Sequence, residues 1–311
     1  MTKVSSKDWM TAFPHKFIGG LGVCVFGMCL SVSAEESHVA GIIAEVRDSV
    51  AKLRSVDLDA VPMAFWDFDG TIIKGDSGLD YEEGGKVCYR GLIPETIRAG
   101  VCPAYKGEDG VRRWKAEWSR MKEHGSWLSQ GFDVQMYHGV EARVLDEFCE
   151  RNLRENRMFD WFFTSSLAIW KALGELGVEN YVVSANVEAL VHNVAPLLGV
   201  SRERIRGSRV VIEGGRLTTR VVQPIPFGEG KLDAVREIVL ARPHGVALVG
   251  FGNSYRTDAA FLRYIVTQRL PGGARPLAIM INGGEEGPKY KGLFHLVSHR
   301  ETVGEALAKD E

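Results

Sequence analysis

The chain is poor in cysteine, with five in 311 residues, and it has no excess of basic residues. So few thiols exclude a small disulfide scaffold and argue against a Cys-x-x-Cys zinc site. Beyond residue 34 the closest pair is Cys88 and Cys102, and spacing alone does not establish a disulfide. A formal net charge of −2 offers nothing to attract a nucleic acid. With 45% hydrophobic and 25% charged residues, the chain is neither disordered nor a polytopic membrane protein.

The first 34 residues differ in character from the rest. Three lysines and a histidine precede an uncharged stretch, residues 17–34, that is rich in glycine and small apolar residues. A basic start, an apolar middle and small residues at Val32 and Ala34 are the parts of a secretory signal peptide. We therefore expect residues 1–34 to direct export, with cleavage after Ala34 and no stable membrane insertion afterwards. The alternative is an uncleaved membrane anchor, because the stretch is close to the length that spans a bilayer.

Helical and strand spacing alternate along the rest of the chain. Residues 39–53 have helical spacing, and the apolar run from Val61 to Phe68 predicts a buried strand because it is too short for a helix. Further strands are expected at residues 180–186, 244–254 and 276–283, with helical spacing between them. This alternation is typical of an α/β fold with a doubly wound parallel sheet and helices on both faces.

One long section interrupts the alternation, and we expect it to form an inserted, mainly helical domain. It covers residues 77–158, and the core domain is then made of residues 35–76 and 159–311. Apolar and aromatic residues recur at helical spacing on two faces within it: Trp114, Trp118 and Met121, then Val140, Val144, Phe148 and Cys149. Later, Gly214 and Gly215 stand between two β-branched runs and predict a hairpin.

Polar side chains follow three of the predicted strands, and a lysine opens a later helix. In chain order these are Asp67 and Asp69, Ser184, Lys231, and Asn253 with Asp258. Because ligand sites in such sheets form at the carboxyl ends of the strands, we expect these side chains to gather there. They suit phosphoryl transfer through an aspartyl phosphate, in which one carboxylate attacks phosphorus and a second carboxyl group protonates the leaving oxygen. A hydroxyl and a lysine hold the phosphoryl oxygens, and a divalent cation offsets the charge.

Four segments carry a resemblance to a known family. They are DFDGT, VVSAN, GEGKLDAV and GFGNSYRTD, which begin at residues 67, 182, 228 and 250. Their order and spacing resemble the four motifs of haloacid-dehalogenase-like phosphatases, and the match runs from about residue 60 to 281. The resemblance implies a phosphomonoesterase that uses Mg²⁺ and acts on a small phosphorylated metabolite. It also implies an exported enzyme if the N-terminal segment is a signal peptide.

The resemblance assigns a role to each residue of the first three motifs. Asp67 is the nucleophile, and Asp69 is the general acid that later activates water. Thr71 supports the motif geometry at the phosphate site, Ser184 binds phosphoryl oxygens, and Lys231 pairs with the nucleophile and the phosphate.

Mg²⁺ would be held by Asp67, the main-chain carbonyl of Asp69 and the last motif. The sequence departs from the family pattern in that motif, since Asn253 stands where many members have an aspartate. An amide oxygen can bind Mg²⁺ but brings no charge. We expect Asp258 to be the direct carboxylate ligand, and the alternative is a weakened affinity for the metal. Asn253 is then either a ligand or a loop cap.

The section 77–158 resembles the helical cap of one subclass, which includes phosphoserine and phosphorylcholine phosphatases. Asp76 stands nine residues after Asp67, similar to the position where phosphoserine phosphatases carry an acidic residue for the substrate amine. A substrate with a cationic head group is therefore one expectation. The same role is open to six residues of the cap, for which a solvated face and a core are the plainer interpretation: Asp80, Tyr81, Glu82, Glu83, Trp114 and Trp118.

Two other functions remain open at this point. One is a phosphotransferase of the same fold, which delivers the phosphoryl group to an alcohol instead of water. The other is a non-catalytic phosphoester-binding protein in which Asn253 marks a lost metal site. In each case the partner is a small-molecule phosphoester and not a nucleic acid.

Overall fold

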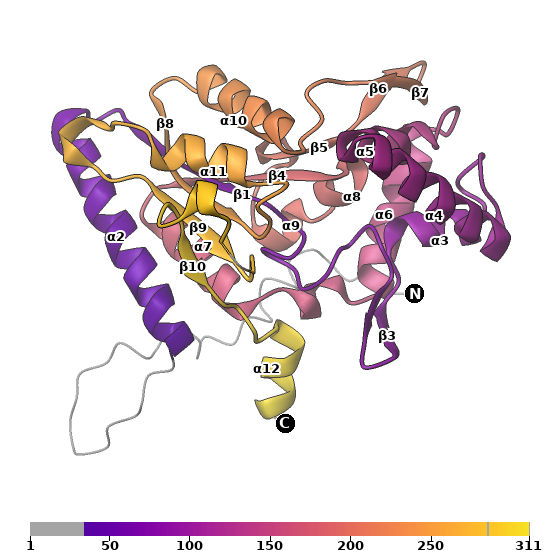
Figure 1. The fold of residues 1–311 in the computed structure, drawn as a ribbon, viewed down its shortest axis with the longest axis horizontal. Helices are drawn as coiled ribbons and strands as arrows, with labels where there is room; N and C mark the ends of the chain where they lie inside the picture. Colours follow the sequence, from indigo (N-terminus) through magenta and orange to yellow (C-terminus); the bar gives the residue numbers. More distant parts are fainter. Residues whose placement is uncertain (1–33, 285, 311) are drawn as a thin grey trace.

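A six-stranded parallel sheet forms the centre of the protein (Figure 1). The computed structural model describes residues 34–284 and 286–310, so the expected signal segment lies outside it except for Ala34. The strand order is β10–β9–β8–β1–β4–β5, with β1 (Val61–Trp66), β4 (Glu179–Val187), β5 (Ile205–Ser208), β8 (Gly245–Gly252), β9 (Leu277–Ile281) and β10 (His295–Val297). The chain reverses its direction of travel across the sheet at β1, which makes this strand end the topological switch point. The predicted fold class is confirmed.

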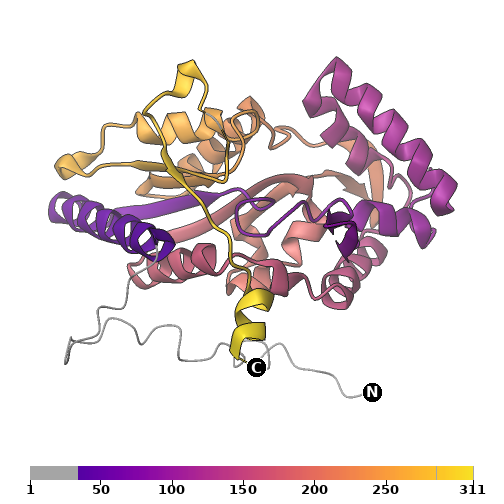
Figure 2. The ribbon, with the colours of Figure 1, turned by 60° about the horizontal axis from the view of Figure 1, so that its bottom comes forward.

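Helices cover both faces of the sheet, as Figure 2 shows. On one face lie α2 (Ala34–Val56) and α7 (Thr164–Glu175), and on the other lie α10 (Glu229–Ala241) and α11 (Ala259–Val266). Side chains of β1 alternate between the two faces, because successive residues of a strand point to opposite sides. Met63 and Phe65 pack in the apolar cluster with α10 and α11, and Trp66 packs in the other cluster.

Trp66 fixes the end of β1 between its two neighbouring strands. Its ring stacks on Phe251 of β8 with a centroid distance of 3.6 Å. Its indole N–H donates to Oδ1 of Asn180 on β4 at 3.0 Å. The residue that follows, Asp67, is therefore held in register with both flanking strands.

The section after β1 forms a cap beside the strand ends. It begins with a short hairpin, β2 (Tyr81–Glu83) and β3 (Lys86–Tyr89), and continues as α3 (Leu92–Arg98), α4 (Gly107–His124), α5 (Ser126–Gln135) and α6 (Ala142–Glu155). Trp114 is buried in the cap and Trp118 is half-buried, and both indole N–H groups donate to the buried carboxylate of Asp133. The exact cap boundaries, residues 77 and 158, stay a prediction.

The predicted Gly214–Gly215 hairpin is present as β6 (Val210–Glu213) and β7 (Arg216–Val221). Both glycines have a left-handed backbone, with φ of 55° and 77°. The hairpin lies against the cap (Figure 1), where Gly139 donates to the Leu217 carbonyl at 2.8 Å and Leu217 donates to the Val140 carbonyl at 2.9 Å. The cap is thus attached to the core by hydrogen bonds as well as by its two chain connections.

The remaining elements are short, apart from the C-terminal helix. They are η2 (Met158–Trp161), α8 (Glu188–His192), α9 (Ala195–Leu198), η3 (Arg202–Arg204), η4 (Pro271–Gly273), η5 (Pro288–Tyr290) and α12 (Val303–Asp310). Within residues 34–284 and 286–310, no helix is both long enough and apolar enough to cross a membrane. Cys88, Cys102 and Cys149 are all free thiols, so Cys88 and Cys102 are not joined.

The segment after β10 ties the C-terminus to the loop that follows β1. Ser166 Oγ donates to the Thr71 carbonyl at 2.6 Å and lies 2.8 Å from Nδ1 of His299. Because the single hydroxyl hydrogen of Ser166 is used on the carbonyl, Nδ1 of His299 must be the donor in the second bond. Burial, with a smaller contribution from the charge of His38, lowers the pKa of His299 to about 4. The imidazole is therefore neutral in the folded protein at ordinary pH.

We expect His299 to make folding weaken as the solution is acidified. In the unfolded chain it takes up a proton below about pH 6.5, whereas in the folded protein it does so only near pH 4, so stability is lost across this window. The substitution His299→Asn keeps a donor near Nδ1 and removes the titration. Between pH 7 and pH 4.5 the free energy of unfolding of the wild type should fall by about 2 kcal/mol more than that of the variant.

Urea unfolding at several pH values measures this difference. The control is His295→Asn on the exposed side of β10, which should leave the pH dependence of the wild type unchanged. Parallel pH curves for the wild type and His299→Asn would contradict the assignment of a buried neutral imidazole.

Candidate active site

A buried lysine joins two carboxylates at the carboxyl end of the sheet. Nζ of Lys231 lies 2.8 Å from Oδ1 of Asp67 and 2.6 Å from Oδ1 of Asp258. Asp67 follows β1 and its N–H donates to the Phe251 carbonyl of β8 at 2.9 Å. Lys231 lies in the first turn of α10 and is 1% exposed, while Asp258 follows β8 and is fully buried. Three of the residues predicted from the sequence are thus in direct contact.

The charges in this cluster shift one another's protonation. Burial alone would lower the pKa of Lys231, but Asp258 and Asp67 outweigh it and raise the pKa, so the ammonium group keeps its charge. Burial, assisted by the negative charge of Asp258, raises the pKa of Asp67 to about 7 against the opposing effect of Lys231. A cation next to Asp67 favours the ionised form that a nucleophile requires.

The side chains of Asp258 and Asn253, both in the last motif, have different contacts. Oδ1 of Asp258 takes the lysine, and Oδ2 accepts the main-chain N–H groups of Asn253 and Ser254 at 3.0 Å each. Asp258 therefore holds the loop and the lysine with both oxygens. The Asn253 amide makes no hydrogen bond with the described residues and lies against Gly70, where a Cβ would be 1.9 Å from its Nδ2. Asn253 is thus the side chain of this motif that faces the loop after Asp69.

Asp69 is held by two residues that the sequence analysis did not select. Oδ1 accepts the N–H and the hydroxyl of Ser77, both at 2.7 Å, and Oδ2 accepts Nδ2 of Asn186 at 3.2 Å. Burial, followed by the charge of Asp76, raises the pKa of Asp69 to about 7, while these hydrogen bonds oppose the rise. Asn186 closes the VVSAN motif and was visible as part of it, but no sequence signal pairs Ser77 with Asp69.

The two predicted hydroxyl groups differ in their surroundings. Oγ of Ser184, at the end of β4, accepts the N–H of Asn186 at 3.1 Å, so its own hydrogen remains for a ligand. Oγ1 of Thr71 is fully buried and has no partner among the described residues. Ser184 lies in β4, the strand beside β1, and Thr71 lies in the loop after β1, and their roles toward phosphate stay predictions.

The acidic residues after the first motif separate into two groups. Asp76 is exposed, and Oδ1 of its carboxylate accepts the N–H of Gly78 at 2.9 Å. Asp80 instead forms ion pairs with Arg98 and Arg90 of the cap. Most other members of this stretch and the cap tryptophans are also engaged: Glu83 with Lys74, Tyr81 with Tyr89 and Trp161, and Trp114 and Trp118 with Asp133. Glu82 is exposed. Asp76 and Glu82 therefore have no ion pair with a described residue, and of the two it is Asp76 whose charge acts on Asp69.

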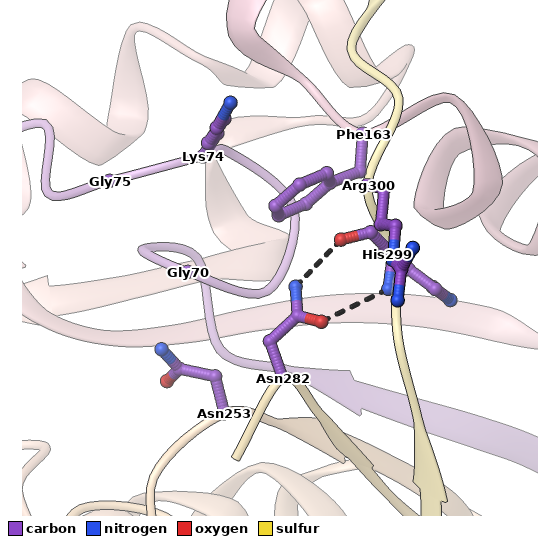
Figure 3. A pocket seen from close by; sticks show the side chains of 8 residues that line it. All are labelled: Gly70, Lys74, Gly75, Phe163, Asn253, Asn282, His299 and Arg300. Atoms are coloured by element: carbon purple, nitrogen blue, oxygen red, sulfur yellow. Dashed lines mark hydrogen bonds between the residues drawn. The ribbon is translucent and has the colours of Figure 1, made fainter. Parts of the chain in front are cut away.

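A cavity of about 370 Å³ flanks the cluster on the side of β9 and β10. Figure 3 shows Gly70 and Asn253 on one side of it and Phe163, Asn282, His299 and Arg300 on the other. Asn282 closes that wall by hydrogen bonds to the main chain of His299. The cavity touches Gly70 and Asn253 but none of Asp67, Asp69, Ser184 or Lys231, so it borders the reacting groups without containing them.

The available oxygens fit a magnesium ion better than a metal that needs nitrogen or sulfur ligands. Among the described residues no three His, Cys, Asp or Glu side chains gather as a metal cluster. Oδ2 of Asp67 and the amide of Asn253 are both free of hydrogen bonds to described residues. Mg²⁺ commonly binds one or two carboxylates and keeps several waters, which such a sparse set of oxygens allows.

Several solved structures share the fold of this chain. The chain is similar to a functionally unknown protein of Anaerococcus prevotii DSM 20548, with 12% identity, a TM-score of 0.54, and coverage of 82% of this chain and 91% of that one. A protein of unknown function from Bordetella pertussis Tohama I gives 16% identity, a TM-score of 0.54, and coverage of 76% and 98%. A structure described as a phospho-aspartyl intermediate analogue of phosphoserine phosphatase gives 16% identity and a TM-score of 0.44. The match covers 81% of this chain and 99% of that one.

Similarity at these identities shows the fold alone, and no curated protein sequence matches the chain. The sequence family described as haloacid dehalogenase-like hydrolase matches residues 64–263, which is more than half of the chain and includes all four motifs. The chain therefore belongs to the haloacid dehalogenase-like hydrolases.

Proposed function

We propose that this protein is an exported, Mg²⁺-dependent phosphomonoesterase that hydrolyses a small phosphorylated metabolite through an aspartyl phosphate. The observation that carries the proposal is the contact of Lys231 with Asp67, next to a second carboxyl group at Asp69. A buried ammonium group beside Asp67 favours the ionised form of this nucleophile and also offsets the charge of a bound phosphate. Family membership supports phosphoester hydrolysis by the same groups.

The chain's own residues account for the two half-reactions. Asp67 attacks phosphorus while Asp69 gives a proton to the leaving oxygen, and Asp69 then takes a proton from the water that cleaves the acyl phosphate. A pKa near 7 suits a group that acts first as acid and then as base. Ser184 and Lys231 hold phosphoryl oxygens. Bound Mg²⁺, held by Asp67, the main chain of Asp69 and Asn253, would supply further positive charge at the phosphoryl group.

Export is proposed from the sequence of residues 1–34, which has a basic start and an apolar middle. Residues 1–33 of this segment lie outside the described residues. If the segment is instead an uncleaved anchor, the full-length chain should stay in the membrane fraction. Intact-mass analysis of the protein from its native host separates cleavage after Ala34 from an uncleaved anchor.

The nucleophile is tested by Asp67→Asn. We expect hydrolysis of 4-nitrophenyl phosphate in the presence of Mg²⁺ to fall by at least about a thousandfold, because the amide cannot form the covalent intermediate. The matched control is Asp233→Asn on α10, an exposed carboxylate paired with Arg236, which should keep the wild-type rate.

The same assay distinguishes the rival functions. Equal rates for the wild type and Asp67→Asn would contradict the covalent mechanism, and the absence of metal-dependent turnover on every phosphoester would favour a binding protein. Glycerol added as an acceptor identifies a phosphotransferase, because the released alcohol would then exceed the released inorganic phosphate.

The metal assignment is tested by Asn253→Asp. Since Asp258 is already committed to Lys231 and two N–H groups, we assign the ligand position of this motif to Asn253 rather than to Asp258. Added negative charge at a ligand should lower the half-saturating Mg²⁺ concentration by about tenfold. Calorimetric titration with Mg²⁺ measures this without turnover. Asn282→Asp adds the same charge to the opposite wall of the cavity and should change the affinity little; an unchanged affinity in Asn253→Asp would refute the assignment.

A cationic substrate is favoured by the state of Asp76. This carboxylate is exposed, its charge acts on the buried Asp133 of the cap, and neither forms an ion pair with a described cation. We expect phosphorylcholine to be hydrolysed about fivefold faster, in kcat/KM, than 3,3-dimethylbutyl phosphate, its uncharged analogue of the same shape.

The variant Asp76→Asn should remove this preference and leave hydrolysis of the uncharged ester as it is. Asp109→Asn, an exposed carboxylate elsewhere on the cap, is the control and should retain the preference. A preference that survives in Asp76→Asn would exclude Asp76 as the group that recognises the cation.

A further inference from the structure

The hydrogen bonds around Asp69 use its two oxygens unequally. Oδ1 accepts two hydrogens, from the N–H and the hydroxyl of Ser77, both at 2.7 Å. Oδ2 accepts one, from Nδ2 of Asn186 at 3.2 Å. A carboxylate oxygen offers about two acceptor positions in the plane of the group. Oδ1 is therefore filled, and the position that remains for a proton is on Oδ2.

The direction of each of these hydrogen bonds is fixed by its neighbours. Oδ1 of Asn186 accepts the N–H of Val187 at 2.8 Å, which requires the amide nitrogen to face Asp69. Nδ2 also lies 3.2 Å from Oγ of Ser77. The amide nitrogen can only donate, so Ser77 Oγ accepts from Asn186 and uses its own hydrogen on Asp69. Asp69, Ser77 and Asn186 form a closed ring with one consistent pattern of donors.

This ring is buried and belongs to the frame of the sheet. Ser77 is 0% and Asn186 is 9% exposed. Asn186 lies at the end of β4, the neighbour of β1, and its main-chain N–H bonds to Ser184. A Cβ on Gly78 would come within 2.8 Å of the Asn186 amide nitrogen, so the chain after Ser77 packs directly on this amide. Burial and hydrogen bonds thus hold both side chains in this arrangement.

We propose that Ser77 and Asn186 are positioning residues that make Oδ2 of Asp69 the atom through which the proton passes; the proposal rests on the hydrolytic function proposed above. In the first step Asp67 forms a bond to phosphorus, the bond from phosphorus to the leaving oxygen breaks, and the proton on Oδ2 moves to that oxygen. In the second step water attacks phosphorus, its proton moves to Oδ2, and the bond to Asp67 breaks. Inorganic phosphate and the original carboxyl pair result.

The proposal predicts a selective defect in Asn186→Ala. A poor leaving group, such as the alkoxide of an alkyl phosphate, must be protonated as it departs, whereas 2,4-dinitrophenolate leaves without a proton. We expect kcat/KM, which reports the steps through cleavage of the leaving bond, to fall about a hundredfold for alkyl phosphates. For 2,4-dinitrophenyl phosphate it should fall less than about fivefold. Ser77→Ala keeps the main-chain donor. Its loss of kcat/KM should also be larger for alkyl phosphates than for 2,4-dinitrophenyl phosphate, but the difference should be smaller than in Asn186→Ala.

A control and a double variant separate positioning from structural damage. Asn193 is an equally well bonded amide, with Ala189, Asp146 and Arg202 as partners, so Asn193→Ala should lower the melting temperature without changing the dependence on leaving group. Ser77 and Asn186 share one ring, and the loss in the double variant should therefore be smaller than the product of the two single losses.

Two results would overturn the inference: an equal loss on all leaving groups, or no loss, in the folded single variants. If Asn186→Ala does not fold, the slope measured for Ser77→Ala decides alone. The variant Asp67→Asn distinguishes a failure of the positioning role from a failure of the proposed function. An inactive Asp67→Asn with a flat dependence in Ser77→Ala and Asn186→Ala removes only the role of the ring, whereas an active Asp67→Asn removes the covalent mechanism itself.

Discussion

The ammonium group of Lys231, enclosed between Asp67 and Asp258, is the interaction on which the rest of the site depends. A buried charge is tolerated only where opposite charges and hydrogen bonds compensate it, and removal of one partner leaves the others uncompensated. The two contacts of 2.8 and 2.6 Å therefore bind three separate segments together: the end of β1, the loop after β8 and the first turn of α10. The positions of Asn253 and Ser254 follow from it, because Asp258 also holds their N–H groups.

The fold and most residues of the candidate site were predictable because they depend on local sequence. Short apolar runs with polar residues at their ends predicted β1, β4, β8 and β9, and parallel strands bring such ends to one edge of a sheet. The hairpin at Gly214 and Gly215 followed from two residues that accept a left-handed backbone. Short strands such as β5 and β10 carry too few residues to show a period, and the pairing of Trp66 with Phe251 is a contact between distant segments.

The division of roles in the last motif was not predictable for the same reason. From the sequence, Asp258 was the natural metal ligand because it is the carboxylate of the motif. Its two oxygens are directed to Lys231 and to the loop, which depends on how α10 approaches the sheet. Likewise, Ser77 meets Asp69 only because the chain after β1 turns back on itself beside the end of β4.

The contact between the β6–β7 hairpin and the loop at Gly139 and Val140 has a consequence for access to the strand ends. A cap connected to a core only by its two chain crossings can rotate about the hinge that these crossings form. The main-chain hydrogen bonds between Leu217 and this loop add a third connection, away from the hinge. Any movement of the cap away from the core would have to bend the hairpin or break those bonds.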